Sequence, residues 1–185
     1  MATSLIPVAP ALDEPLEILS ACHGRVLAQL ETLRRLLAHL PAQGADQQAQ
    51  QAAAAVLRYF DTAAKHHHED EEIDLLPALE AAVAPADAPA LAQLRQRVLA
   101  EHVRLAGLWA ALRPQLDDVR LGLHSTLDEQ SVVDMDAAYR QHIEFEESHL
   151  LPLARQLLDQ QTLRDLGRAM TLRRSAPPVI PATGG

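Results

Sequence analysis

The 185-residue sequence has few of the residue types on which several common architectures depend. Its one cysteine, Cys22, excludes a disulfide framework within the chain and any CxxC zinc or redox motif, and it suits a reducing cytoplasm. Aromatic residues make up 3%, and the apolar stretches lack the alternation of half-buried strands, which disfavours β-sheet. No run of about 18 apolar residues occurs, and residues 1–12 lack the basic and apolar regions of a signal peptide. We therefore expect a cytoplasmic protein with no membrane partner.

Basic residues are also scarce. The chain has 16 Lys and Arg against 25 Asp and Glu, which gives a formal net charge of −9. A nucleic-acid-binding protein normally has a basic face, and none is evident, so no nucleic-acid partner is expected. The only basic cluster lies near the C-terminal end, where we interpret it as the solvated surface of a last helix. It consists of Arg164, Arg168, Arg173 and Arg174.

What the sequence does contain favours helix. Alanine and leucine dominate the 48% of residues that are hydrophobic, and both have high helix propensity. Apolar residues recur at alternating spacings of three and four, which is the stripe of an amphipathic helix. The stripes predict four long helices: from Asp13 as N-cap to Leu40, from Asp46 to before Pro85, from Ala90 to Val119, and from after Thr126 to Leu157.

Four such helices with short or moderate connections predict an all-α, up-down-up-down four-helix bundle over residues 13–174. A short fifth helix is expected over 162–172, and Pro114 should bend or shorten the third helix. Residues 1–12 are expected to form a loose lead-in and 175–185 a disordered tail. The alternative arrangement is a helical hairpin that dimerises to complete the bundle, so a monomer and a homodimer both stay open.

Each of the four apolar stripes is interrupted by a histidine, and two of them also by a glutamate. The six residues are His23, His67, Glu71, His102, His142 and Glu146. One buried histidine can be satisfied by a hydrogen bond, but buried charges cost several kcal/mol unless they are paired or bound to metal. The six residues are therefore candidate metal ligands.

The spacing of these residues is repeated. Two segments, 67–77 and 142–152, share the pattern H-x-x-x-E-E-x-x-L-L-P. A lone striped histidine precedes each copy, His23 by 44 residues and His102 by 40. A pattern of this length that occurs twice is a strong sign of an internal repeat. The chain therefore reads as two helical hairpins, each with one lone histidine and one His-x-x-x-Glu pair.

The i, i+4 spacing places the histidine and the first glutamate of each copy one turn apart on the same helix face. Their nitrogen and oxygen atoms can converge on one cation, and this donor set suits iron, manganese or zinc. The absence of thiolates argues against a structural zinc site. If both glutamates bridge two ions, each ion receives two imidazoles and two carboxylate oxygens. An oxo or hydroxo bridge then leaves about one octahedral position open for a small molecule.

Both motif copies, with the two lone histidines, resemble the hemerythrin-like or HHE cation-binding family over about residues 16–158. The LGRAM stretch at 166–170 is also similar to bacterial members. The resemblance implies a four-helix bundle with two iron ions in a non-haem di-iron centre, for which manganese or zinc can substitute. The implied ligands are His23, His67, Glu71, His102, His142 and Glu146.

The resemblance also implies a role in binding dioxygen, nitric oxide or related oxidants, in stress response, sensing or iron-centre repair. The sequence departs from oxygen-carrying hemerythrins, in which a second helix-3 histidine stands where this chain has Ala106. Their helix-4 aspartate lies five residues after the histidine, an offset that falls on Glu147 here. These departures disfavour simple oxygen transport. A di-iron oxidase or peroxidase and an iron storage or donation protein remain the alternatives, so enzyme activity stays open.

The other histidines and acids near the motifs are expected outside the ligand set. His66 and His68 lie about 100° to either side of His67 on an ideal helix, which predicts positions on the surface or behind the ligands. His68 and Glu72 form a second i, i+4 pair, the main rival for the ligands of that helix. His149 is expected to point inward one layer away. The acids expected to be solvated or to lie behind the ligands are Asp70, Glu72 and Glu147.

Overall fold

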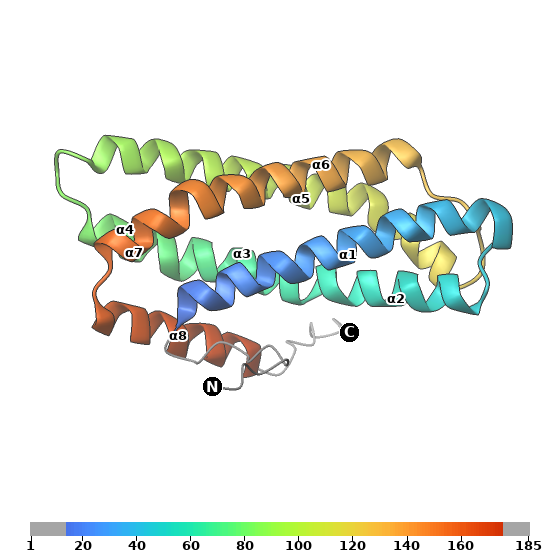
Figure 1. Cartoon of the computed structure of the whole chain (residues 1–185), viewed down its shortest axis with the longest axis horizontal. Coiled ribbons are helices and arrows are strands. Elements are labelled where there is room, and N and C mark those ends of the chain that lie inside the picture. Colours follow the sequence, from blue (N-terminus) through green and yellow to red (C-terminus); the bar gives the residue numbers. More distant parts are fainter. Residues whose placement is uncertain (1–13, 176–185) are drawn as a thin grey trace, which may run out of the picture.

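Four helical rods lie side by side in the computed structural model, which describes residues 14–175 (Figure 1). Chain direction alternates from one rod to the next. The first rod is α1 (Pro15–Gln43) and the third is α5 (Ala88–Arg120). The second comprises α2 (Gln47–Asp61), α3 (Ala63–Glu69), η1 (Asp70–Leu75) and α4 (Leu76–Ala82). The fourth comprises α6 (Glu129–Phe145), η2 (Glu146–Leu150) and α7 (Leu151–Leu157). The described residues contain no strand, so the expected all-α bundle is confirmed.

Local sequence signals explain where several rods begin and end. Asp46 caps α2 by accepting a hydrogen bond from the Ala49 amide, 2.8 Å away, and Asp128 caps α6 in the same manner. Such caps satisfy amides that have no partner within the helix. Gly44 ends α1 with φ +67°, a conformation that costs glycine little. The expected cap Asp13 lies outside the described residues.

Pro114 does not shorten the third helix, because α5 continues past it to Arg120. The alternative, a bend at Pro114, stays a prediction. Pro41 likewise lies inside α1, which runs on to Gln43. Both prolines fall within the last two turns and are exposed. Water can therefore reach the carbonyl that each proline leaves without a donor, which reduces the cost of keeping the helix intact.

Both copies of the repeat form a wide π turn, which the sequence pattern did not lead us to expect. These turns, η1 and η2, begin within four residues of His67 and His142. Each ends where α4 or α7 starts, with Pro77 or Pro152 as the second residue. A proline removes an amide donor and its ring clashes with the carbonyl four residues earlier, so a wider turn relieves the clash. The L-L-P ending of the motif is therefore the local cause of the π turns.

The apolar core is divided into two clusters by a polar layer. One cluster, around Leu30, Leu112 and Met135, fills the half of the bundle that contains α2. The other, around Leu75, Leu79 and Leu151, fills the half that contains α4 and α7. On the first three rods the candidate ligands lie between the two clusters in sequence, and on the fourth His142 and Glu146 flank Ile143 of the first cluster and Phe145 of the second. Two apolar clusters thus pack the four rods together on either side of the polar layer.

The last described element is α8 (Gln160–Ser175), which contacts α1 and η1 (Figure 1). The fifth helix is longer than the expected range 162–172, and Ser175, assigned to a disordered tail, is helical. The whole expected lead-in, residues 1–12, and residues 176–185 of the expected tail lie outside the described residues. Leu166 and Met170 of α8 are buried in the second core cluster.

The basic cluster of α8 is not simply solvated, as the sequence suggested. Arg173 and Arg174 both donate to the carboxylate of Asp70, which is 1% exposed, and Arg173 also donates to Asp74 at 2.6 Å. Arg164 and Arg168 do lie on the exposed surface. Buried charges are stable only when paired, so the two arginines tie α8 to η1, the turn that contains Glu71.

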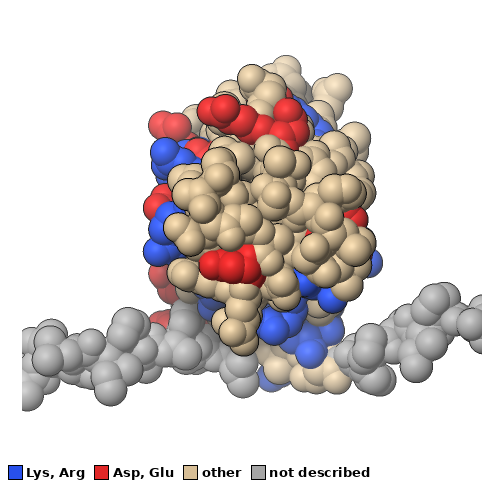
Figure 2. Space-filling model, turned by 90° about the vertical axis from the view of Figure 1, so that its right-hand side faces the viewer, with Lys and Arg blue, Asp and Glu red and all other residues tan. Residues whose placement is uncertain are grey.

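Among the described residues, no helix is both long enough and apolar enough to cross a membrane. Figure 2 views the end of the bundle that carries the α1–α2 and α5–α6 connections. Uncharged side chains cover most of this end, with acidic groups in separate patches (Figure 2).

Candidate metal centre

All six candidate ligands meet in the polar layer, and each is at most 4% exposed. Apart from Asp70, they are the only buried polar or charged side chains among the described residues. We call His23 and His67 the first histidine pair, and His102 and His142 the second. Glu71 lies in η1 and Glu146 in η2. The bundle thus brings together residues from all four rods, as the repeat predicted.

The two glutamates lie between the histidine pairs. Glu71 turns Oε1 toward His67 Nε2 at 3.5 Å and Oε2 toward His102 Nε2 at 3.3 Å. Glu146 turns Oε2 toward His23 Nε2 at 3.0 Å and Oε1 toward His142 Nε2 at 3.2 Å. Each carboxylate therefore presents one oxygen to each histidine pair.

These contacts define two overlapping groups of donor atoms. Within each group the donor atoms all lie within 4.8 Å of one another. The first group is His23, His67, Glu71 and Glu146, and the second is His102, His142, Glu71 and Glu146. Four nitrogen or oxygen donors at such distances can close around a single cation.

The donor atoms are poorly satisfied by the protein itself. Both oxygens of Glu71, Oε1 of Glu146 and Nε2 of His102 and His142 are buried without a hydrogen-bond partner in the described structure. A buried polar atom without a partner costs about 1–3 kcal/mol, and more when it is charged. Imidazole and carboxylate donors that face one another in this way fit a metal ion, which accepts their lone pairs.

A second layer of carboxylates holds the lone histidines. His23 Nδ1 lies 2.7 Å from Glu147 Oε1, and His102 Nδ1 lies 2.7 Å from Glu72 Oε1. In each case the second glutamate of a motif copy contacts the lone histidine of the other hairpin. Such a contact fixes the ring orientation and makes the opposite nitrogen a stronger donor. Both E-E pairs are thus explained, with the first glutamate facing the centre and the second facing an imidazole.

The remaining two histidines differ from each other. His142 Nδ1 lies 2.9 Å from Glu101 Oε2, which belongs to α5. His67 Nδ1 is buried and has no partner among the described residues. The repeat is therefore symmetric at the centre and asymmetric in the layer around it.

Burial and the two carboxylates together set the charge of the layer. Burial lowers the pKa of His67 to about 3. Burial acts in the same direction on His23 and His102, but the nearby glutamates outweigh it and raise their pKa values to about 9 and about 10. Burial, with the neighbouring Glu146, raises the pKa of Glu71 to about 8. The adjacent imidazoles outweigh burial at Glu146 and hold its pKa well below the ordinary value. The layer therefore favours positive charge beside the glutamates.

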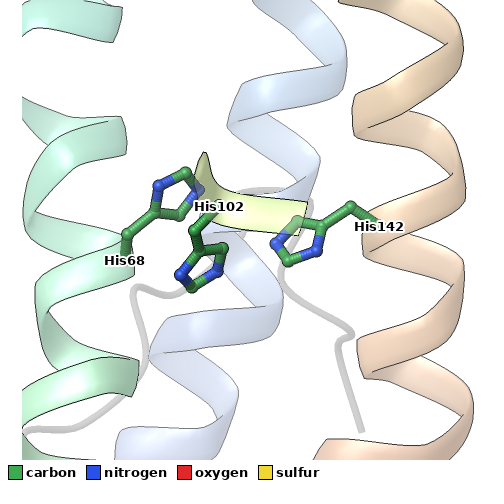
Figure 3. A group of neighbouring side chains, drawn as sticks. All are labelled: His68, His102 and His142. Atoms are coloured by element: carbon green, nitrogen blue, oxygen red, sulfur yellow. The ribbon is translucent and has the colours of Figure 1, made fainter. Parts of the chain in front are cut away.

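His68 lies behind the ligands, which is one of the two places expected for it. Its ring stacks on His102, with centroids 4.0 Å apart and planes 12° apart, and lies edge-on to His142 at 5.8 Å (Figure 3). The donor atoms of these three histidines also lie within 4.8 Å of one another. A rotation of about 100° from His67 does not reach solvent here, because α5 packs against that face. The sequence left two places open for His68, the surface or behind the ligands, because an ideal single helix says nothing about its neighbours.

Other expectations about nearby residues are corrected as well. His149 is exposed rather than inward, because η2 interrupts the α-helical register between His142 and His149. Asp70 is buried and paired with arginines rather than solvated. Glu72, the proposed rival ligand, is exposed and contacts the outer nitrogen of His102. The rival pair of His68 and Glu72 is therefore not assembled at the centre.

Comparison with known proteins gives a consistent result. The family model described as Hemerythrin HHE cation binding domain matches residues 14–154. A protein of Haemophilus influenzae, described as an uncharacterized protein, is 32% identical over 162 residues, which cover 88% of this chain and 91% of the relative. The matched region contains the first three rods, the fourth rod up to residue 154, and every residue of the polar layer. The chain belongs to the hemerythrin HHE cation-binding domain family.

Proposed function

We propose that the chain holds two iron ions in the polar layer and that this iron pair binds dioxygen, nitric oxide or a related oxidant. In a cell the protein would serve stress response, sensing or repair of iron centres. The observation that carries the proposal is the arrangement of Glu71 and Glu146, each of which faces one oxygen to each histidine pair. This arrangement suits two bridged cations better than one.

The donor set also supports an open centre. Each group offers two imidazole nitrogens and two carboxylate oxygens. First-row metals with such ligands commonly take six, so positions remain for a bridge and for an exchangeable molecule. Imidazole with carboxylate suits manganese and zinc too, and the resemblance to hemerythrin-like proteins favours iron. Bound iron would supply the redox chemistry and the exchangeable position at which a diatomic molecule binds.

The protein's own residues would prepare the site for that chemistry. The two apolar clusters exclude water from both sides of the layer. Glu147 and Glu72 hold the rings of His23 and His102, so that Nε2 of each faces the centre. Glu101 does the same for His142. A rigid, dry site of this kind binds a small ligand with little reorganisation.

The proposal is tested by metal content and optical spectra. Protein from iron-supplemented cells should contain about two iron ions per chain, and azide or nitric oxide should change its charge-transfer bands. A zinc-loaded sample should show no such change, because a d¹⁰ ion lacks those transitions. Glu71→Ala and Glu146→Ala should each lower the iron content, whereas Glu144→Ala, an exposed residue of α6, should not.

Two results would overturn the proposal in different ways. One iron per chain at saturation would refute the bridged pair. Two ions per chain with a spectrum indifferent to azide, nitric oxide and oxygen would indicate a closed centre. In that case a storage or structural role would replace ligand binding.

A further inference from the structure

A pocket of about 320 Å³ lies beside the second histidine pair, between the second, third and fourth rods. Its lining is mostly apolar and aromatic: Phe60, Ala64, Leu105, Ala106, Trp109 and Tyr139. Asp61 and Lys65, which are exposed, mark its outer side. His68 also lines the pocket and is the wall nearest the centre, since it contacts His102 and His142.

His68 lines this pocket and lies beside the rings of His102 and His142 (Figure 3). Its Nε2 is buried and has no hydrogen-bond partner, and no hydrogen bond or ion pair holds the side chain in the described structure. Rotation of His68 therefore breaks no polar contact. By contrast, the three histidines held by Glu147, Glu72 and Glu101 are each tied at Nδ1. The half-buried ring of His68 can therefore move at lower cost than those three rings.

The ring geometry argues against His68 as a further metal ligand. An imidazole donates through a lone pair that lies in the ring plane, so two imidazoles share one ion only where their planes meet close to both rings. The planes of His68 and His102 are 12° apart with centroids separated by 4.0 Å. Such nearly parallel planes meet far from either ring. A common ion at the usual distance of about 2 Å from both nitrogens does not fit this arrangement.

We propose that small uncharged molecules reach the metal pair through this pocket and that His68 is the gate at its inner end. The inference rests on the proposed function, which supplies the metal pair. The apolar walls favour a neutral diatomic molecule over a hydrated ion. The two core clusters close the layer along the bundle axis, whereas the pocket leads to its side. Movement of the His68 side chain then opens the passage from the pocket to the second histidine pair.

Rates of nitric oxide binding to the iron-loaded protein test the route. Ala106→Phe narrows the pocket from an exposed position on α5, away from the core. It should lower the association and dissociation rates together, by about tenfold or more, and leave Kd unchanged. His68→Ala should raise both rates together. Ala90→Phe is the matched control, since it makes the same change at an exposed position of α5 that lines a different pocket.

A second readout needs no iron. Trp109 is the only tryptophan of the chain and lines the pocket. In zinc-loaded protein, quenching of its fluorescence by dissolved dioxygen should fall in Ala106→Phe and stay unchanged in Ala90→Phe. Equal quenching in both variants would show that the pocket does not admit the diatomic molecule, and would refute the route whatever the iron-loaded protein does.

The remaining outcomes separate the two proposals. Nitric oxide that fails to bind the wild-type iron protein at all would refute the proposed function. Binding with equal rates in the wild type, Ala106→Phe and His68→Ala would refute only the gate. If His68→Ala lowers iron content or shifts the spectrum before nitric oxide is added, His68 is a ligand and the gate is also refuted.

Discussion

Simultaneous replacement of Arg173 and Arg174 by alanine should destabilise the fold by about 3–5 kcal/mol, the usual cost of leaving a buried charge without its partner. Asp70 is 1% exposed and both arginines donate to it, with Arg174 Nη2 at 2.5 Å. Either arginine alone still neutralises the carboxylate. Each single replacement should therefore cost less, about 1–2 kcal/mol, and the two effects should be more than additive. Of the two, Arg173 should matter more, because it also binds Asp74.

Urea denaturation of zinc-loaded protein measures this effect. Arg164→Ala with Arg168→Ala is the matched control, because both side chains lie exposed on the same helix. That variant should stay within about 1 kcal/mol of the wild type. Adding Asp70→Ala to the Arg173/Arg174 variant should restore part of the lost stability by removing the uncompensated charge. A double variant no less stable than its control would refute the reasoning.

Two further predictions concern metal affinity. Glu72→Gln and Glu147→Gln should each lower the metal affinity by about 10–100-fold, since both side chains orient an imidazole. Chelator competition measures the affinity, and an effect no larger than that of Glu144→Gln would count against this prediction. Metal binding should release protons and strengthen by more than about tenfold per pH unit between pH 6 and 8. The reason is that the pKa values of about 9 at His23 and about 10 at His102 leave both protonated in that range, and a metal must displace those protons. Calorimetry in two buffers of different ionisation enthalpy checks the release, and an affinity that does not change with pH would contradict it.

The sequence predicts much of the centre because its signal is periodic. A stripe at spacings of three and four determines which face of each helix turns inward. A polar residue on that stripe is therefore placed in the core without knowledge of its neighbours. For this reason the stripes alone place four histidines on inward faces: His23, His67, His102 and His142. The repeated motif adds the two glutamates on the same basis.

Residues off the stripe could not be placed in this way. The role of Glu147 depends on contact with His23, which is 124 residues away in sequence. The burial of Asp70 depends on its contact with Arg173, which is 103 residues away in sequence, and therefore on the docking of α8. No local pattern encodes such distances. The prediction that His149 points inward failed for a different reason, since a π turn shifts the helical register that the stripe assumes. The proline of each motif was the signal available for that turn.

Comparison of equivalent positions in the repeat shows where the two halves of the centre differ. Position 101 precedes His102 as position 22 precedes His23, yet one is Glu101 and the other is Cys22. Glu101 contacts Nδ1 of His142, whereas Nδ1 of His67 has no partner in the described structure. A carboxylate at that nitrogen makes an imidazole a stronger donor. The two histidine pairs therefore offer donors of different strength, although their distances to the glutamates are similar.

A second difference between the two halves of the repeat also lies beside the second histidine pair. His68 follows His67 as Ile143 follows His142, so only the first hairpin supplies an imidazole at this place. Ala106 lies four residues after His102, where the equivalent residue of the first hairpin is Leu27, which packs against the apolar core. A small residue on α5 leaves space where leucine fills it on α1. The space beside the second histidine pair and the unpaired ring that borders it thus both arise at positions where the two halves of the repeat differ, while the six residues of the centre keep its symmetry.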